Sequence, residues 1–296
     1  MNRSLAAIGT AGLLVAASTS AWASGPQPVI TTPYARTPAG NSTYLVWSMR
    51  SPGKSHYNAY WRRKSWNASR RINPSGTDAF LGGIDGTRVV YQLVSGSQSD
   101  IELFDIRSRT PSEPPPGVNT SAWEREPTLS APYILFGRGN PANHNTVRKV
   151  ILFNMATAKS TLLAKTGPGV YSVVPGQVNG HFATWWRCST SRCDVFRRDL
   201  GTGKTVMVPN PGGKLLYASS VSPTGTVFVA RSGFGCGAGV SLLRFRAGRV
   251  TTLASFGKGI DIGQSFAYTA GGKTTVLFDR LLCKDKLWDI YKVVTK

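Results

Sequence analysis

Acidic residues are scarce in this chain of 296 residues. There are 14 Asp and Glu against 35 Lys and Arg, which leaves a formal net charge of +21. A field of this sign attracts polyanions and anionic surfaces, so the expected partner classes are wall polymers, anionic lipid, acidic polysaccharide and extracellular nucleic acid. A solubility role or a general compositional bias is the alternative explanation. The basic residues do not form one long run, which excludes a disordered basic tail.

Catalytic signatures are also missing. The sequence has no H-E-x-x-H, G-x-S-x-G, P-loop or dinucleotide-binding motif, and no Ser-x-Asp-x-Gly-x-Thr-Trp box. Hard cations need several oxygen ligands together, and the four acids that could supply them are scattered. These candidates are Asp78, Glu124, Glu126 and Asp261. We therefore predict no catalytic residue, no metal and no cofactor.

Long apolar runs are confined to the N-terminus. Arg3 precedes an apolar stretch over residues 5–17, and Ala21 and Ala23 frame an A-x-A cleavage site before Ser24. The run is shorter than the roughly 20 residues that a transmembrane helix needs. We interpret residues 1–23 as a signal peptide and expect residues 24–296 to be one soluble, secreted domain with no transmembrane segment.

Cysteines number only four. In an exported chain this count predicts two disulfides, although four cysteines allow three pairings. Cys188 and Cys193 stand at the two mouths of one predicted hairpin, which leaves Cys236 and Cys283 in equivalent loops of two successive repeats. A zinc site is the rival interpretation, but the spacing of CSTSRC is not C-x-x-C and no His lies near the other pair.

A repeat of about 45 residues runs through the rest of the chain. One ladder places a large side chain in a strand every 44–49 residues: Trp47, Tyr91, Phe136, Trp185, Val229 and Phe278. A second ladder follows in the next strand: Trp61, Asp105, Asn154, Asp199, Arg244 and Asp289. Short strands with this period are typical of a β-propeller with one four-stranded sheet per repeat. We predict an all-β fold of six four-stranded antiparallel blades, and a β-sandwich is the alternative.

The repeat resembles a known family. Gly-containing turns such as Asp85-Gly86 and Asn179-Gly180 precede a strand with an aromatic anchor, and a polar loop then leads to a strand ending in Asp or Asn. This pattern, over about residues 29–296, is similar to the TolB-like, WD-like β-propeller repeat. Blade 5 departs from it at Val229 and Arg244, and blade 1 departs at Trp61. The resemblance implies a periplasmic or secreted scaffold that contacts other macromolecules.

The ends of the chain are expected to close the ring. The last repeat lacks a fourth strand, and an open sheet edge is a liability. Val29 and Ile30 precede the first strand of blade 1 and have no partner there, so we expect them to pair with residues 288–293 as the outermost strand of blade 6.

Arginines recur two residues beyond the aromatic anchors. Alternation along a strand puts this position on the same side as the anchor, near one rim. The predicted ring comprises Arg50, Arg138, Arg187, Arg231 and Arg280. Guanidinium groups suit carboxylates and phosphates, which predicts a basic face for an anionic polymer or a protein. Pairing of each Arg with an acid or carbonyl between blades is the alternative.

Two function classes remain open at this stage. The first is a monomeric binding or scaffold module. Nucleic acid is a less favoured partner, because Trp185 and Trp186 fall within predicted strands rather than on stacking platforms. The second is a lyase or hydrolase acting on an acidic saccharide at the channel mouth. There the arginines would neutralise the substrate and a loop histidine, His56 or His144, would be the base, whereas His181 begins a strand.

Overall fold

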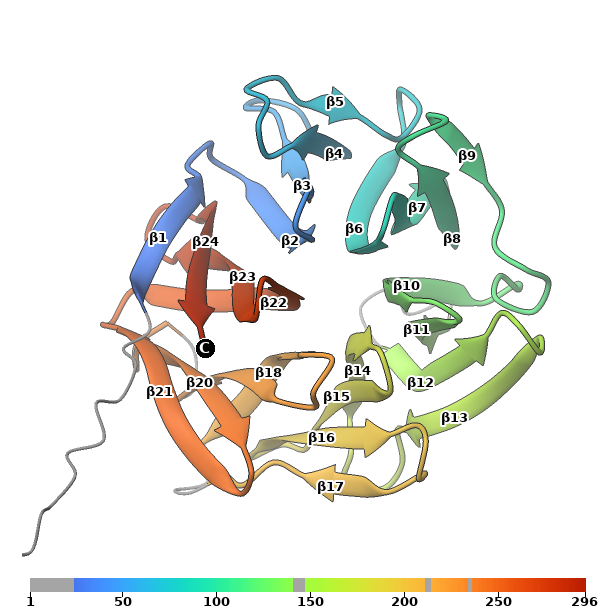
Figure 1. The fold of residues 1–296 in the computed structure, drawn as a ribbon. Helices are drawn as coiled ribbons and strands as arrows, with labels where there is room; N and C mark the ends of the chain where they lie inside the picture. The colour runs from blue at the N-terminus through green and yellow to red at the C-terminus, as the bar shows by residue number, and fades with distance from the viewer. Residues whose placement is uncertain (1–23, 141–146, 211–213, 234–235) are drawn as a thin grey trace, which may run out of the picture.

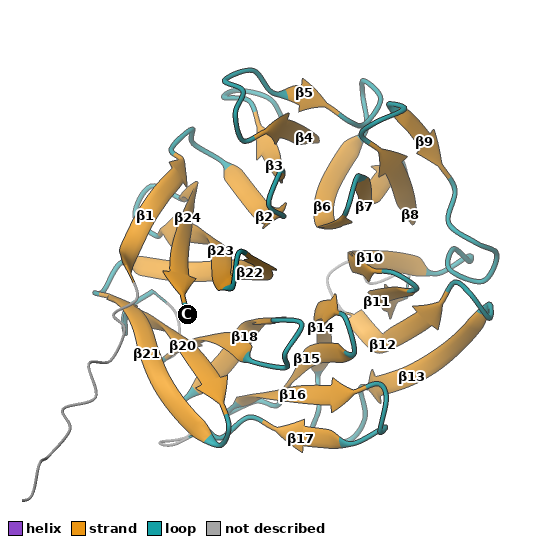
Figure 2. Ribbon diagram, viewed as in Figure 1, coloured by secondary structure: helices purple, strands orange, loops and turns teal. Residues whose placement is uncertain are grey.

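A computed structural model describes residues 24–140, 147–210, 214–233 and 236–296. These residues form six four-stranded antiparallel sheets and no helix, and the sheets stand as blades around a central axis (Figure 1, Figure 2). The predicted six-bladed propeller is confirmed. The predicted signal peptide and His144 lie outside the described residues. No described helix has the length and apolarity to cross a membrane.

Each blade consists of consecutive strands, except that blade 6 takes its outermost strand from the N-terminus. From the innermost strand outward, blade 1 is β2 (Ala35–Gly40), β3 (Tyr44–Arg50), β4 (Tyr57–Arg63) and β5 (Arg70–Arg71); blade 2 is β6 (Asp78–Asp85), β7 (Arg88–Ser95), β8 (Gln98–Asp105) and β9 (Thr110–Ser112); blade 3 is β10 (Trp123–Ser130), β11 (Tyr133–Gly139), β12 (Val147–Asn154) and β13 (Lys159–Lys165). Blade 4 is β14 (Ser172–Asn179), β15 (Phe182–Cys188), β16 (Cys193–Asp199) and β17 (Thr205–Met207); blade 5 is β18 (Leu215–Val221), β19 (Val227–Ser232), β20 (Val240–Arg246) and β21 (Arg249–Phe256); blade 6 is β22 (Ile260–Ala270), β23 (Lys273–Leu282), β24 (Leu287–Thr295) and β1 (Ser24–Ile30).

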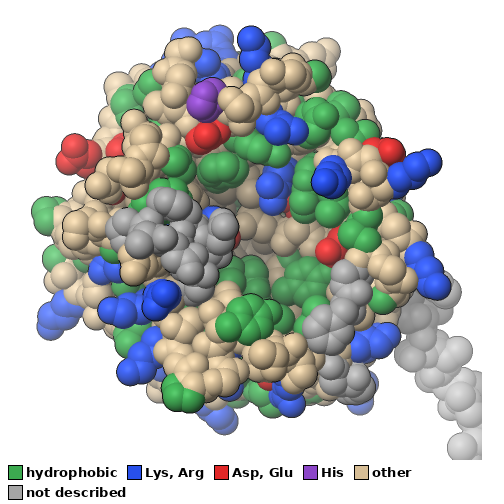
Figure 3. Space-filling view, turned by 180° about the vertical axis from the view of Figure 1, so that it is seen from behind, with side chains coloured by type: hydrophobic (Ala, Val, Ile, Leu, Met, Phe, Trp, Pro, Cys, Tyr) green, Lys and Arg blue, Asp and Glu red, His purple; other side chains and the backbone are tan. Residues whose placement is uncertain are grey.

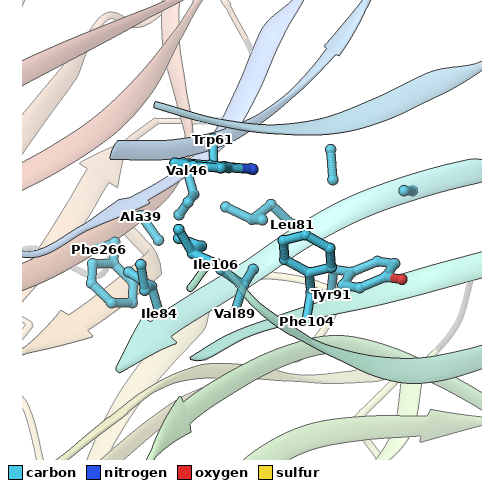
Figure 4. Packing of buried hydrophobic residues seen from close by; sticks show 12 residues of the cluster. Ala39, Val46, Trp61, Leu81, Ile84, Val89, Tyr91, Phe104, Ile106 and Phe266 are labelled. Carbon is cyan, nitrogen blue, oxygen red and sulfur yellow. The ribbon is translucent and has the colours of Figure 1, made fainter. Parts of the chain in front are cut away.

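The core lies between neighbouring blades. All six anchors of the first ladder are on second strands and are at most 4% exposed. Between blades 1 and 2, Val46 and Trp61 pack against Leu81 and Val89, and Phe266 of blade 6 joins them from the channel side (Figure 4). Each blade therefore has an apolar layer on both sides, because its strands alternate between two neighbours.

The second ladder is correct in only three blades. Asp105, Asn154 and Asp199 end the third strands of blades 2–4, and each side chain accepts backbone N–H bonds in the turn that follows. These are local Asx turns. Trp61, Arg244 and Asp289 instead lie inside their strands. The period alone misplaced these three residues, because the connections between second and third strands differ in length from blade to blade.

The N-terminal closure is confirmed. β1 pairs antiparallel with β24, with Ile30 opposite Ile290 and Pro28 opposite Tyr291. Pro28 is tolerated because β1 is the outermost strand of blade 6, where a missing N–H leaves no ladder bond unmade. The two ends of the described chain therefore lie side by side in one sheet (Figure 1).

Both predicted disulfides are formed. Cys188 and Cys193 face each other across the β15–β16 hairpin. Cys236 and Cys283 join the equivalent connections of blades 5 and 6, with their Cα atoms 6.0 Å apart. Such bonds indicate an oxidising compartment.

Every innermost strand carries a bulge at the same height. The register shifts by one residue in β2, β6, β10, β14, β18 and β22. Three of the bulges place a non-glycine residue at positive φ, namely Thr37 (49°), Glu126 (51°) and Ala218 (51°). A bulge leaves backbone N–H groups without ladder partners, so the channel wall at this height needs acceptors from other residues.

Candidate binding face around the central channel

The five predicted arginines lie at one end of the propeller. Each is near the end of the second strand of its blade, beside the connection to the third strand. We call this end the arginine face. Figure 3 shows the molecule from this side, hollowed at its centre and with Lys and Arg side chains spread around the rim.

Two of these arginines are neutralised within their own blades. Arg138 Nε donates to Glu124 Oε1 at 2.8 Å, and Arg138 Nη2 donates to the Val118 carbonyl. Arg280 binds both oxygens of Asp289, with Nη2 to Oδ2 at 2.6 Å. The hydrogen bonds that the Arg280 guanidinium donates to the Asp289 carboxylate raise the pKa of Arg280. For Arg138 and Arg280 the alternative of pairing with an acid is therefore what the structure shows.

The other three form no ion pair with a described residue. The Arg50 guanidinium stacks 4.5 Å from the Tyr34 ring centroid and 5.7 Å from that of Tyr57. Arg187 is exposed and lies 5.0 Å over the Phe196 ring, while its cross-strand neighbour Asp194 is held by Arg192. Arg231 is half-buried and likewise forms no ion pair with a described residue.

The channel behind this face is narrow. One cavity in it, of about 20 Å³, is lined by bulge residues of all six blades, including Gly82, Glu126 and Ser219. A volume of this size holds about one water molecule. A second cavity of about 130 Å³ opens at the other end of the channel and has Gln177 in its wall.

Gln177 links three blades in the wall of the second cavity. Its Oε1 accepts from the backbone N–H groups of Val221, at 3.2 Å, and Ala267, at 2.9 Å. Its Nε2 donates to the Ala267 carbonyl at 2.8 Å. One buried side chain of blade 4 thus binds the inner strands of blades 5 and 6.

Buried carboxylates satisfy the bulges. Asp279 is fully buried and accepts from the N–H groups of Thr37 and Gln264. Burial raises the pKa of Asp279, and the nearby Arg36 and these N–H donors oppose that rise. Burial likewise raises the pKa of Glu126, against the pull of Arg125 and Arg36. The Asp279 carboxylate thus serves the bulges of blades 6 and 1, whereas Glu126 Oε2 has no hydrogen-bond partner among the described residues.

The four acidic candidates do not come together. Asp78 accepts from the Tyr57 N–H at 2.6 Å, Asp261 accepts from the Tyr217 hydroxyl, Glu124 is occupied by Arg138, and Glu126 is half-buried at its bulge. Burial raises the pKa of Glu124, against the pull of Thr120 and Arg138. Among the described residues no group of three His, Cys, Asp or Glu side chains could hold a metal ion.

His56 has one acidic neighbour. Its Nδ1 lies 3.3 Å from Asp78 Oδ2, and its side chain is 54% exposed. A general base works in a site that also positions substrate, and an exposed imidazole at the rim offers no such enclosure. The hydrogen bonds by which Gln177 and Asp279 join neighbouring blades had no signal in the sequence, because isolated polar residues within strands carry no motif.

Comparisons with known proteins agree on the fold. No protein-family model and no curated protein matches the chain. Among solved structures it is similar to TolB from Acinetobacter baumannii, at 13% identity and TM-score 0.57, over 86% of this chain and 64% of that one. It is also similar to an Agrobacterium tumefaciens protein assigned as TolB, at 13% identity and TM-score 0.58, over 90% of this chain and 92% of that one. The chain has a TolB-like six-bladed propeller fold.

Proposed function

We propose that this protein is an exported binding or scaffold propeller whose arginine face takes an anionic polymer or an acidic protein surface. The observation that carries the proposal is the set Arg50, Arg187 and Arg231, which share one face and have no carboxylate partner among the described residues. Planar guanidinium groups bind carboxylate and phosphate through paired N–H donors. A low content of acid elsewhere in the chain leaves these charges uncompensated.

Export is part of the proposal. Two disulfides fit an oxidising compartment, and the apolar N-terminal stretch with its A-x-A site has the form of a signal peptide. The geometry favours binding over the lyase or hydrolase alternative, because His56 stands exposed at the rim and the four acidic candidates do not come together.

A polyanion column tests this face. Heparin serves as the probe, and the salt concentration needed for elution is the readout, because binding through several charges weakens steeply as salt rises. We expect Arg187→Gln/Arg231→Gln to elute at clearly lower salt than the unaltered protein. The charge-matched control is Arg246→Gln/Arg249→Gln, in the exposed β20–β21 turn of blade 5.

The control separates the face from the overall charge. Both double variants lose two positive charges, and their folding is compared by thermal melting. Elution of Arg187→Gln/Arg231→Gln at the same salt as the control would show that the net charge, rather than the arginine face, holds the polyanion. That result would overturn the proposal.

A further inference from the structure

Blade 1 is the positive pole of the molecule. The first acidic residue of the whole sequence is Asp78, which begins blade 2. Residues 35–77, which make up blade 1, therefore contain no acid, and they contain eight basic residues: Arg36, Arg50, Lys54, Arg62, Arg63, Lys64, Arg70 and Arg71. By contrast, residues 78–122 of blade 2 contain six acids and three bases. This asymmetry gives the propeller a preferred orientation in front of a negative surface.

Five of the eight basic residues are in one short hairpin. We call residues 62–71 the basic hairpin; they comprise the end of β4, the turn that follows, and β5. β5 is only two residues long, Arg70–Arg71, and both side chains are exposed. At this outermost edge the blade presents side chains rather than a long strand.

An exposed tryptophan lies within this hairpin. Trp66 is 38% exposed, whereas every other tryptophan among the described residues is buried or half-buried. The guanidinium carbons of Arg63 and Arg70 lie 5.7 Å and 5.9 Å from its ring centroid. The indole is thus flanked by two positive charges, and its inner side contacts the buried Trp61 at a centroid distance of 6.0 Å.

The charges of the hairpin have no internal counter-ion. No ion pair joins any of its basic residues to an acid in the described part of the chain. Lys64 anchors the hairpin by donating to the Asn41 carbonyl and to the Tyr268 hydroxyl of blade 6. Arg62 is half-buried, donates to the Val29 carbonyl and lies over the Trp47 ring. The remaining three, Arg63, Arg70 and Arg71, are exposed and form no ion pair in the described part of the chain, which leaves them for an external anion.

The basic hairpin and the arginine face are separate surfaces. β4 runs from Tyr57, paired with Arg50 at the arginine face, to Arg63, paired with Tyr44 at the opposite end. Seven residues of strand span roughly 20 Å. The hairpin is therefore at the outer edge of blade 1, at the end opposite the arginine face.

We infer that the basic hairpin is a docking surface for an anionic phospholipid bilayer. Arg and Lys near a membrane surface gain attraction from acidic lipid, and an amphipathic indole sits at the level of the headgroups. A hairpin at the edge of the molecule, with one aromatic ring between two arginines, suits a flat surface of anionic lipid headgroups. A polysaccharide or nucleic-acid strand would instead need a groove that follows its backbone, or a row of stacking rings.

Vesicle flotation tests the inference. The protein is mixed with vesicles of phosphatidylcholine alone or with about 30% phosphatidylglycerol, at low and physiological salt. We expect it to float with the anionic vesicles only. The triple variant Arg63→Gln/Arg70→Gln/Arg71→Gln should lower the partition constant on the order of a hundredfold. A charge-matched control, Arg244→Gln/Arg246→Gln/Arg249→Gln, alters the corresponding hairpin of blade 5, which has no exposed aromatic residue, and should lower it far less.

Fluorescence shows whether Trp66 reaches the lipid. Vesicles with brominated acyl chains should quench part of the tryptophan emission, and the Trp66→Phe variant should lose that quenching while thermal melting confirms that it is folded. Three results would overturn the inference: no flotation with anionic vesicles, equal losses in the two triple variants, or flotation without quenching from Trp66. If the protein is retained on heparin but shows the first of these results, the proposal for the arginine face stays intact.

Discussion

The buried carboxylate of Asp279, on β23 of blade 6, accepts a hydrogen bond from the backbone N–H of Thr37, on β2 of blade 1, at 2.9 Å. The two residues are 242 positions apart in sequence. Asp279 also accepts from Gln264 in its own blade. One side chain therefore serves two bulges across the junction at which the ring closes.

Removing this carboxylate should destabilise the whole ring. Asp279→Ala leaves buried N–H groups without acceptors, and we expect a loss of about 3 kcal/mol or more in the free energy of unfolding. Asp279→Asn keeps one acceptor oxygen and should lose less. The control is Asp285→Ala, at an exposed site, and thermal denaturation is the measurement. A melting temperature of Asp279→Ala equal to that of the control would contradict this role.

The N-terminal strand should stabilise all six blades together. β1 completes blade 6 by pairing with β24, and its loss exposes an unpaired edge at the seam. Deleting residues 24–31 should lower the melting temperature in a single calorimetric transition, because ring closure is shared by every blade. An unchanged melting temperature, or a separate low-temperature transition for blade 6 alone, would show that β1 does not stabilise the whole ring.

Gln177 should matter for stability through its hydrogen bonds rather than its volume. Gln177→Leu fills much of the same space but leaves the Val221 and Ala267 backbone groups unpaired. We expect both Gln177→Leu and Gln177→Ala to lose about 2–4 kcal/mol in urea unfolding. Gln98→Ala, at an exposed position of β8, is the matched control. Unaltered stability of Gln177→Leu would mean that the Gln177 side chain contributes by packing alone.

Glu102 should make stability depend on pH near neutrality. Burial, then the like charges of Glu113 and Asp100, raise the pKa of Glu102 from 4.5 to about 7. The folded protein therefore holds this proton more tightly than the unfolded chain, so stability falls as pH rises from about 4.5 to about 7. Because Glu102 is half exposed and screened, Glu102→Gln should gain only about 1 kcal/mol at pH 8 and nothing at pH 4. A variant with the same pH slope as the unaltered protein would exclude Glu102 as the cause.

The sequence by itself determined the architecture. Large side chains such as Trp47 and Phe136 recur at a fixed interval, and each buries one position of a second strand. A repeated apolar position must be buried in the same way each time, so period and turn residues were enough to predict six blades. The N-terminal closure followed as well, because the last repeat was one strand short. The Cys188–Cys193 bond was equally local, since it closes a single hairpin.

Only the tertiary structure decided how the polar residues are used. Arg138 and Arg187 occupy equivalent positions in the repeat, yet Arg138 is neutralised by Glu124 while Arg187 has no acid to bind. The spacing of the repeat determines the backbone position of a side chain, but its electrostatic partner comes from another strand or another blade. The same holds for Asp279 and Gln177, which bind backbone groups of other blades. Trp66 shows the converse: its neighbours in sequence are basic, and only the short outer strand of blade 1 leaves it exposed among them.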